Sequence, residues 1–490
     1  MYHPNKKHRV ILEEIAHQAM LDYGLLPEFT ENVMQEVENL QLTIDMTGDT
    51  IQDLRHLPWC SIDNDRSRDL DQISYAKELP DGKIRVLVAI SEVGALVKQN
   101  SAIDNHAKHN TTSVYTPAVL YSMLPERLST ELTSLVFDQA RQAVVYTLDI
   151  SPTGILEHWE VGFGLVCNKA KLSYNEVGDW LEDKTALPKS IEAVKGLAHS
   201  ISLQDKVAQH LRINRQKHGA LSLETAATRP EFEGDELLSM ERKEKNRARI
   251  LIEDLMICTN GVCALYLEAA ERPSFRRVVH TPKRWPRIVE IAAEQGITLP
   301  DAPVSIALEQ FLSTMKERDS EGFLDLSLSI IKLLGPGEYM VDLPGEDIEG
   351  HFGLAVRDYT HSTAPNRRYP DLITQRLVQS ALLKLPAPYT VEELRELAIH
   401  CNKAESSAKK VERRVDKSAT AMLLENKIGN EYDGIITGAA TKGTWVRLFH
   451  PSCEGRLVES KSPVDVGQRV KVKLLATDVN QGFLDFALIE

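Results

Sequence analysis

Four aspartates fall within nine residues of one segment, SIDNDRSRDLDQISY (61–75): they are Asp63, Asp65, Asp69 and Asp71. Carboxylates this close together repel one another unless a cation neutralises them. A set of ligands that is all oxygen, with no His or Cys, is what a hard ion such as Mg²⁺ or Mn²⁺ prefers. The spacing therefore predicts a site for a divalent metal ion.

Two other interpretations of this acidic segment have to be weighed. A calcium loop of the EF-hand type that starts at Asp63 would need Gly where Arg68 stands and Glu where Ser74 stands, so it is excluded. A solvated acidic turn remains an alternative. The apolar neighbours Leu70 and Ile73 favour a loop that is tethered to a core, and hence a site.

A cationic segment, HSTAPNRRYPDL (361–372), follows much later in the chain, with Arg367 and Arg368 between two prolines. Arginine presents a planar fork that matches phosphate oxygens in a bidentate fashion. An arginine opposite a carboxylate metal site is what phosphoryl transfer requires. The alternative is a surface turn with an ordinary ion pair to Asp371. The motifs GxxxxGK[ST], HExxH and GxSxG are absent from the sequence, which argues against nucleotide triphosphatases, zinc proteases and common serine hydrolases.

The length of the chain and the helices and strands expected from its apolar patterns indicate a multidomain α+β protein. At 490 residues, of which 42% are hydrophobic, the chain is long enough for about two to four domains. The apolar pattern of residues 1–55 predicts a small helical module. This module is either a helix-turn-helix or winged-helix element, or a set of helices that only pack against the rest of the protein. Residues 56–427 predict a large α+β unit that ends in a long linker helix. Residues 428–490 contain short strands broken by glycines, which predict an OB-fold barrel.

The balance of charge gives two opposing indications. Acidic residues outnumber basic ones by 71 to 57, for a formal net charge of −14, and this argues against a partner held by a globally basic surface. Residues 272–287, however, contain six basic residues and no acid. The linker helix adds Lys409, Lys410, Arg413, Arg414 and Lys417. We expect these clusters to line the path of a polyanion such as a nucleic acid, with a solvated face as the alternative.

The cysteines and the apolar pattern bear on location. The six cysteines form no CxxC pair, as is usual for reduced thiols in the cytosol. The basic first residues meet Glu13 and Glu14 before any apolar stretch, and no uninterrupted apolar run of about 18 residues is present. We therefore expect a cytoplasmic protein with no membrane partner.

Several blocks of the sequence, in order, resemble one family. They are similar to the RNB catalytic domain and S1-type OB domain of the ribonuclease II and ribonuclease R exoribonucleases. The blocks are the segment 61–75, AIDNHAKHNTTSVYTPAVLYSMLPERLSTELTSL (102–135), LIEDLMICTN (251–260), the segment around 361–372 and the terminal barrel. The resemblance implies Mg²⁺-dependent (or Mn²⁺-dependent), processive 3′-to-5′ hydrolysis of single-stranded RNA to nucleoside 5′-monophosphates in RNA degradation.

The resemblance also implies roles for individual residues. Asp63, Asp69 and Asp71 match the catalytic aspartates that hold the metal, and Arg367 matches the arginine beside the scissile phosphate. Tyr115 matches the aromatic residue that holds the 3′-terminal nucleotide. The residues that match the contacts to the ribose, and so favour RNA over DNA, are Tyr174 and Glu253.

The chain departs from the family pattern at three places. Gln72 stands where the family usually has a fourth aspartate, and an amide carbonyl can bind Mg²⁺ but brings no charge. Leu223 stands where an aromatic base wedge is expected, which weakens stacking there. The cold-shock domains of longer members are replaced by the helical module of residues 1–55.

Three functions are therefore compared. The preferred one is an exoribonuclease, which we expect to be a monomer. The main alternative is an RNA-binding regulator whose catalytic site has decayed at Gln72. Duplex-DNA binding through the N-terminal helices has the weakest support.

Overall fold

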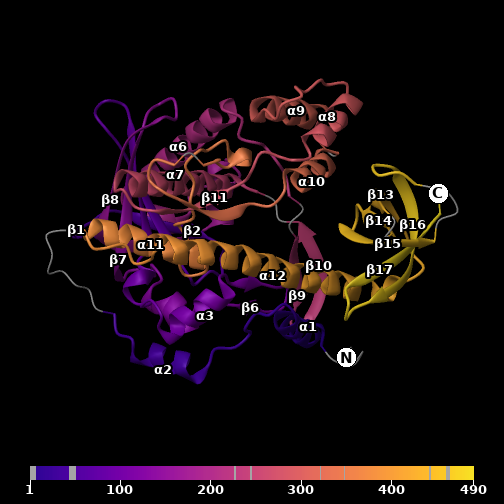
Figure 1. Ribbon diagram of the computed structural model, residues 1–490, viewed down its shortest axis with the longest axis horizontal. Helices are drawn as coiled ribbons and strands as arrows, with labels where there is room; N and C mark the ends of the chain where they lie inside the picture. Colours follow the sequence, from indigo (N-terminus) through magenta and orange to yellow (C-terminus); the bar gives the residue numbers. More distant parts are fainter. Residues whose placement is uncertain are drawn as a thin grey trace.

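A mixed sheet forms the centre of an α+β body, which a closed β-barrel follows (Figure 1). The computed structural model describes residues 7–42, 51–225, 228–242, 245–320, 322–346, 348–440, 443–459 and 464–489. The strands of the sheet follow the order β1-β8-β2-β3-β4-β7, and β8 also pairs with β7, so that β8, β2, β3, β4 and β7 form a closed circuit. Their bounds are β1 (Ile51–Asp53), β2 (Trp59–Asp63), β3 (Gln72–Glu78), β4 (Ile84–Ser91), β7 (Ala140–Ile150) and β8 (Leu156–Ser173).

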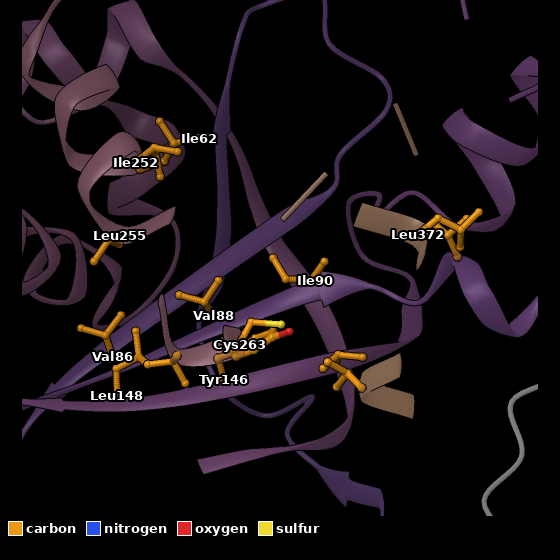
Figure 2. Close-up of a cluster of buried hydrophobic side chains, with 14 of the residues drawn as sticks. Ile62, Val86, Val88, Ile90, Tyr146, Leu148, Ile252, Leu255, Cys263 and Leu372 are labelled. Carbon is orange, nitrogen blue, oxygen red and sulfur yellow. The ribbon is translucent and has the colours of Figure 1, made fainter. Parts of the chain in front are cut away.

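Both faces of this sheet are covered, which explains its long apolar runs. Strand β4 reads IRVLVAIS, and seven of its eight residues are buried. Its alternate side chains enter different cores, because successive residues of a strand point to opposite faces. Leu87 packs with Trp59 and Ile73 on one face. Val86 and Val88 pack on the other face against helix side chains (Figure 2).

Three helices supply most of the helical side chains of that second core: α6 (Leu197–Lys217), α7 (Arg247–Ala269) and α11 (Tyr369–Leu382). Helix α7 is long and apolar enough to cross a bilayer by length and composition alone. In this protein 61% of its apolar stretch is buried against the rest of the chain, as in the core helix of a soluble protein, so the resemblance to a membrane span is weak evidence. The expected absence of a membrane partner remains a prediction.

The helical N-terminal part consists of α1 (His8–Asp22) and α2 (Glu31–Asn39). Helix α1 packs through Leu12 and Ala16 into a core that it shares with α12 (Val391–Leu424) and the barrel. Helix α2 packs through Val33 and Val37 near α3 (Ala102–Asn110). The helix-turn-helix interpretation remains a prediction. Strand β1 already pairs with β8, so the sheet begins just before the expected boundary at residue 56.

The long helix α12 connects the body to the barrel and crosses the middle of the molecule (Figure 1). It begins with a capping box in which Thr390 and Glu393 satisfy each other's backbone N–H groups. The barrel order is β13-β14-β15-β17-β16, which confirms the expected OB-type architecture. The strands are β13 (Glu431–Ala440), β14 (Gly443–Leu448), β15 (Cys453–Glu459), β16 (Arg469–Asp478) and β17 (Phe483–Leu488).

Smaller elements complete the body. Helices α8 to α10 form a separate apolar cluster at the top of Figure 1. The remaining bounds are β5 (Val114–Tyr115), β6 (Leu120–Tyr121), α4 (Tyr174–Leu181), α5 (Lys189–Glu192), β9 (Thr228–Glu233), β10 (Glu236–Arg242), β11 (Ser274–Val278), α8 (Trp285–Glu294), α9 (Ser305–Arg318), α10 (Phe323–Leu334) and β12 (Glu338–Asp342); short turns of helix cover Val93–Ala95, Arg127–Leu132, Phe352–Leu354 and Glu425–Lys427.

Candidate active site

The aspartates lie in the loop that joins β2 to β3. Asp63 is the last residue of β2, and Asp71 directly precedes β3. The Leu70 N–H donates to Ser134 Oγ over 2.9 Å, and the Leu70 carbonyl accepts from the backbone of Leu135 over 3.0 Å. The Leu70 side chain is buried between its two acidic neighbours. This anchoring holds Asp69 and Asp71 in place and argues against a freely solvated acidic turn.

Asp71 is the most buried of these carboxylates, with 1% of its side chain exposed. Its Oδ1 accepts a hydrogen bond from the Asn366 backbone N–H over 3.0 Å. Its Oδ2 lies 3.3 Å from Arg367 Nε but has no hydrogen-bond partner among the described residues. Burial raises the pKa of Asp71 to about 7, and the Arg367 guanidinium opposes that rise. Burial also raises the pKa of Asp69, again against the effect of Arg367.

The two arginines of the cationic segment have different tasks. Arg367 faces Asp71, and its side chain is 40% exposed, so it remains accessible. Arg368 makes the ion pair with Asp371 that sequence reasoning held as the alternative, over 2.7 Å, and Asp371 is fully buried. That pair fixes the start of α11, where a carboxylate also interacts well with the helix N-terminus. The ion pair with Asp371 is therefore made by Arg368 and not by Arg367, and it is buried rather than part of a surface turn.

Tyr115 reaches the same place from a neighbouring loop. The Arg367 carbonyl accepts from the Ser113 backbone over 3.0 Å, and the Tyr115 N–H donates to Glu412 Oε1 of α12 over 3.0 Å. Tyr115 is 47% exposed. Burial of its hydroxyl raises its pKa, and the nearby Arg367 lowers it. The aromatic side chain thus lies beside the arginine and is open to a ligand.

Tyr174 lies on the opposite flank, at the start of α4. Burial raises its pKa to about 12, and the negative charge of Asp63 adds to the rise. The Arg249 guanidinium stacks over the Tyr174 ring at 4.3 Å and donates to Asn64 Oδ1 over 3.0 Å. The structure therefore brings together six of the predicted residues: Asp63, Asp69, Asp71, Arg367, Tyr115 and Tyr174.

The positions of Glu253 and Gln72 give no direct support for the roles expected of them. Glu253 is exposed on α7, and its carboxylate pairs with Lys245 over 2.8 Å rather than with any of the aspartates. Gln72 is buried as the first residue of β3, opposite Ile90 of β4. Leu223 packs beside the apolar cluster of α8 to α10 and is not presented as a base wedge. The roles of Glu253 and Gln72 remain predictions.

Sequence reasoning missed two polar residues of the site. Asn366 ties three segments together: besides its backbone bond to Asp71, its amide donates to Ser91 Oγ over 3.1 Å, and its carbonyl accepts from Thr133. Arg249 was the other omission. The position of Asn366 directly before Arg367 was a usable signal. Nothing in the sequence near Arg249 distinguished it from other cations on helices.

One expectation about the basic clusters is wrong. Within residues 272–287, Arg276 and Arg277 are buried in ion pairs, Arg276 with Asp342 over 2.9 Å and Arg277 with Glu405 over 2.7 Å. A charge that is buried on a strand has to be paired, and carboxylates from other elements neutralise both arginines here. These two residues therefore do not line an RNA path.

The donor set fits a hard divalent ion in chemistry. All its candidate ligands are oxygens, Asp71 Oδ2 is buried without a hydrogen-bond partner among the described residues, and a cation would relieve the burial of the Asp71 charge. In the part of the chain that the structure describes, no three Asp, Glu, His or Cys side chains come close enough together to form a ligand set by themselves. Asp63, Asp69 and Asp71, with the side-chain carbonyl of Gln72, are the residues that would hold such an ion.

Two family models match the chain. The RNB domain matches residues 51–384, and the RNase II-type exonuclease C-terminal S1 domain matches residues 430–489. Ribonuclease R 1 of Lactococcus lactis is 27% identical over 504 residues, with 96% of this chain and 60% of that protein covered. Ribonuclease R of Escherichia coli is 28% identical over 482 residues, with 89% and 57% covered. The chain thus spans about 60% of the length of these curated relatives.

Solved structures give the same result. Mycoplasma genitalium RNase R in complex with ribose methylated single-stranded RNA matches with a TM-score of 0.88 and 26% identity, over 99% of this chain and 78% of that one. The same enzyme in complex with double-stranded RNA matches with a TM-score of 0.86 and 26% identity, over 99% and 84%. Yeast Ssd1, a pseudonuclease, shares the fold at a TM-score of 0.74 and 14% identity, over 94% and 57%.

Proposed function

The chain belongs to the RNB domain family, and on this premise we propose that it is an exoribonuclease that degrades single-stranded RNA processively from the 3′ end. Its products are nucleoside 5′-monophosphates, and its cofactor is Mg²⁺, with Mn²⁺ as a substitute. One observation carries the proposal. The buried Asp71 carboxylate and the accessible Arg367 guanidinium, from distant segments, lie 3.3 Å apart.

Arg367 is the residue that recognises the phosphate. In the protein without substrate its guanidinium neutralises Asp71. An incoming phosphodiester offers two oxygens to the same fork, and the guanidinium then stabilises the negative charge that develops on the phosphate during in-line attack by water. Asp71, released from this pair, becomes available as a ligand together with Asp63, Asp69 and the carbonyl of Gln72. When bound, the metal ion supplies Lewis-acid activation of water and charge neutralisation at the leaving oxygen.

The two tyrosines select the substrate end. The half-exposed Tyr115 ring stacks on the 3′-terminal base, because aromatic stacking is favourable with any base. The Tyr174 hydroxyl, beside Asp63, donates a hydrogen bond to a 2′-OH, a group that DNA lacks. Arg249 holds the Tyr174 ring in position from above.

A 5′-labelled oligoribonucleotide tests the activity. With the full chain and Mg²⁺ we expect the labelled RNA to shorten from its 3′ end and nucleoside 5′-monophosphates to appear. The Asp71→Asn variant should bind the same RNA without shortening it, and a deoxyribonucleotide of the same sequence should persist. An RNA that stays intact with the wild-type chain in Mg²⁺ and in Mn²⁺ contradicts the proposal.

A specific observation favours a second function, an RNA-binding regulator without turnover. Gln72 brings no charge where the family usually has an aspartate, so one metal ion would be held more weakly. Binding of RNA without release of monophosphates, in either metal ion, selects this alternative. The Gln72→Asp variant then separates the two functions further, since it should create activity in a decayed enzyme and raise metal affinity in an active one.

The location and oligomeric state belong to the proposal as well. We propose a cytoplasmic monomer. All six cysteines are free thiols, as expected in a reducing compartment. Light scattering during gel filtration tests the monomer, and fractionation of cells tests the location.

A further inference from the structure

The segment that contains α2 holds α3 at both of its ends. At the start of α3, Glu36 Oε2 accepts a hydrogen bond from the Ile103 backbone N–H over 3.1 Å. At its end, the Asn110 side chain pairs with the backbone of Leu26 through hydrogen bonds of 2.9 and 2.8 Å, as a neighbouring strand would. Residues 24–40, called the brace below, therefore form one unit with α3, and Figure 1 shows α2 next to α3.

The brace also contacts a second segment of the chain. The Arg127 guanidinium donates to the Leu40 carbonyl over 3.2 Å and to the Val37 carbonyl, both at the C-terminal end of α2. The last carbonyls of a helix lack partners within the helix, so a cation there satisfies them and interacts favourably with the helix dipole. Arg127 begins a π-helical turn that ends at Leu132. Such turns are rare and often occur at functional sites.

Helix α3 connects the brace to the arginine of the candidate active site. After α3 the chain turns at Thr111, whose φ of +59° is unusual for a β-branched residue. The Thr111 carbonyl accepts from the Tyr369 backbone N–H over 2.7 Å, and the Ser113 N–H donates to the Arg367 carbonyl over 3.0 Å. Asp104 of α3 accepts from the Tyr369 hydroxyl over 3.1 Å. The backbone that presents Arg367 is therefore attached to α3.

The π-helical turn connects the brace to the aspartates. Shortly after the turn, Ser134 Oγ accepts from the Leu70 N–H over 2.9 Å. The Leu135 N–H donates to the Leu70 carbonyl over 3.0 Å. Leu70 stands between Asp69 and Asp71 in the sequence. The loop that presents the aspartates is therefore attached to the segment that Arg127 begins.

One element thus supports both loops of the candidate active site. We propose that the brace aligns these loops, with Arg127 and Asn110 as positioning residues, an inference that rests on the proposed function. Arg127 acts on the aspartate loop, and Asn110 acts through α3 on the loop that presents Arg367. The bond from Asn366 to Asp71 joins the two loops directly, and the brace limits how far each loop moves. This matters because a displacement of about 1 Å lowers a rate by up to about 10²-fold.

Amide hydrogen exchange of the full chain in EDTA tests the brace without metal or RNA. The Arg127→Met variant keeps the apolar stem but loses both bonds to α2, so exchange in residues 68–71 should be about tenfold faster. The Asn110→Ala variant should instead speed up exchange in residues 112–115 by about tenfold. The Arg127→Lys variant keeps a cationic donor for the carbonyls of α2 and should restore most of the protection.

Metal binding and kinetics provide a second readout. The Arg127→Met variant should raise the Mg²⁺ concentration that half-saturates the increase in melting temperature by about fivefold, because the aspartate loop is less well ordered. Its kcat should fall about tenfold with little change in KM. The Asn110→Ala variant should lower kcat without changing the Mg²⁺ concentration, since it acts on the other loop. A residue with a purely structural role would not separate these effects.

The control variant removes an arginine that contacts neither the brace nor the two loops. Arg85, near the start of β4, pairs with the buried Asp149 over 2.7 Å. The Arg85→Met variant leaves that buried carboxylate unpaired, so it should lower the melting temperature. Exchange in residues 68–71 and 112–115, the response to Mg²⁺ and kcat should stay as in the wild type.

The outcomes separate the brace from the proposed hydrolysis. Unchanged exchange in both loops of the two brace variants would overturn the proposal. Equal acceleration in the Arg85→Met variant would overturn it too, because the effect would then be a general loosening of the fold. Loop-specific acceleration in a chain that degrades no RNA in Mg²⁺ supports the brace and refutes only the proposed hydrolysis.

Discussion

The Asn366 backbone N–H donates a 3.0 Å hydrogen bond to Asp71 Oδ1, across 295 positions of sequence. Through this bond the loop that presents Arg367 is aligned with the loop that presents the aspartates. The Asn366 side chain extends the same link to Ser91 at the end of β4 and to Thr133. The relative position of the Asp71 carboxylate and the Arg367 guanidinium is therefore set by one buried residue, Asn366.

The Asn366→Ala variant should show this positioning role. It keeps the backbone bond to Asp71 but leaves the buried Ser91 hydroxyl without its partner, which costs about 1–3 kcal/mol of the free energy of unfolding, while the Thr133 hydroxyl keeps its bond to the Leu128 carbonyl. We expect kcat to fall about tenfold with little change in KM, since a displacement of the loop affects the reacting groups more than the binding surface. Urea unfolding and steady-state kinetics measure the two effects. Normal kcat in a destabilised variant would restrict Asn366 to a purely structural role.

Arg367 and Arg368 offer a matched pair of substitutions. Arg367→Gln should lower kcat/KM by about 10²–10³-fold, because the accessible guanidinium acts on the developing charge of the phosphate. It should cost less stability than Arg368→Gln, because Asp71, whose pKa is already raised to about 7, can take up a proton when its cation is removed. Arg368→Gln should instead cost about 3–5 kcal/mol of stability, since it leaves the fully buried Asp371 without its cation. Denaturant curves and kinetics on both variants check the division of roles. An equal loss of stability in both variants contradicts it.

Metal binding should be visible as a change in stability. Burial holds the Asp71 carboxylate at a cost, and a divalent ion that binds only the folded chain stabilises it by mass action. At pH 8, saturating Mg²⁺ should raise the melting temperature of the wild type by several degrees. The Asp71→Asn variant should melt at a higher temperature than the wild type in EDTA, because it lacks the buried charge, and should not respond to Mg²⁺. A similar response of both chains to Mg²⁺ would place the metal elsewhere.

Sequence reasoning reached the site in part, and the limits are physical. The spacing of Asp63, Asp69 and Asp71 and the paired arginines were visible because metal chemistry and phosphate recognition need particular residue types close together in the chain. The division between Arg367 and Arg368 was not visible, since adjacent residues of the same type differ only in what packs around them. The basic segment 272–287 misled for the same reason: a strand carries Arg276 and Arg277 inward to carboxylates from distant parts of the chain.

The fold was more predictable in its elements than in its connections. The apolar run of β4 and the glycine-broken strands of the barrel predicted the correct element types. The pairing of β8 with β1, β2 and β7 depends on which long strand lies beside which, and a local pattern does not encode that choice. The hairpin of β9 and β10 was missed as well.

Family resemblance implies that Tyr174 and Glu253 both contact the ribose, but the structure predicts different effects of the two residues on the preference for RNA over DNA. Tyr174→Phe removes the hydroxyl beside Asp63, and we expect the preference for RNA over DNA, as a ratio of kcat/KM values, to fall about tenfold. Glu253→Gln should change that ratio less than twofold, because the carboxylate is exposed and engaged by Lys245. Competition between a ribose and a deoxyribose oligonucleotide of the same sequence measures the ratio. A large effect of Glu253→Gln would show that this side chain swings onto the ribose when substrate binds.

The buried Glu92 leads to a prediction about how the free energy of unfolding depends on pH, and this prediction is independent of metal binding. Burial raises its pKa to about 7, its Oε2 has no hydrogen-bond partner among the described residues, and the Gln379 amide that donates to Oε1 only partly opposes the rise. In the unfolded chain this group loses its proton near its ordinary value of 4.5. Because the folded chain holds the proton more tightly, the contribution of Glu92 to stability is fully present below about pH 4.5 and is lost as the pH rises to about 7, a loss of about 3 kcal/mol.

The Glu92→Gln variant should remove that dependence. Relative to the wild type, its free energy of unfolding should rise by about 3 kcal/mol between pH 4.5 and pH 8, since the amide stays neutral throughout. Glu78→Gln, at the exposed end of β3, is the matched control and should give no such trend. Urea unfolding at both pH values measures the difference. If Glu92→Gln and the wild type differ by the same amount at both pH values, the buried carboxyl is already ionised at low pH, and the rise in its pKa is refuted.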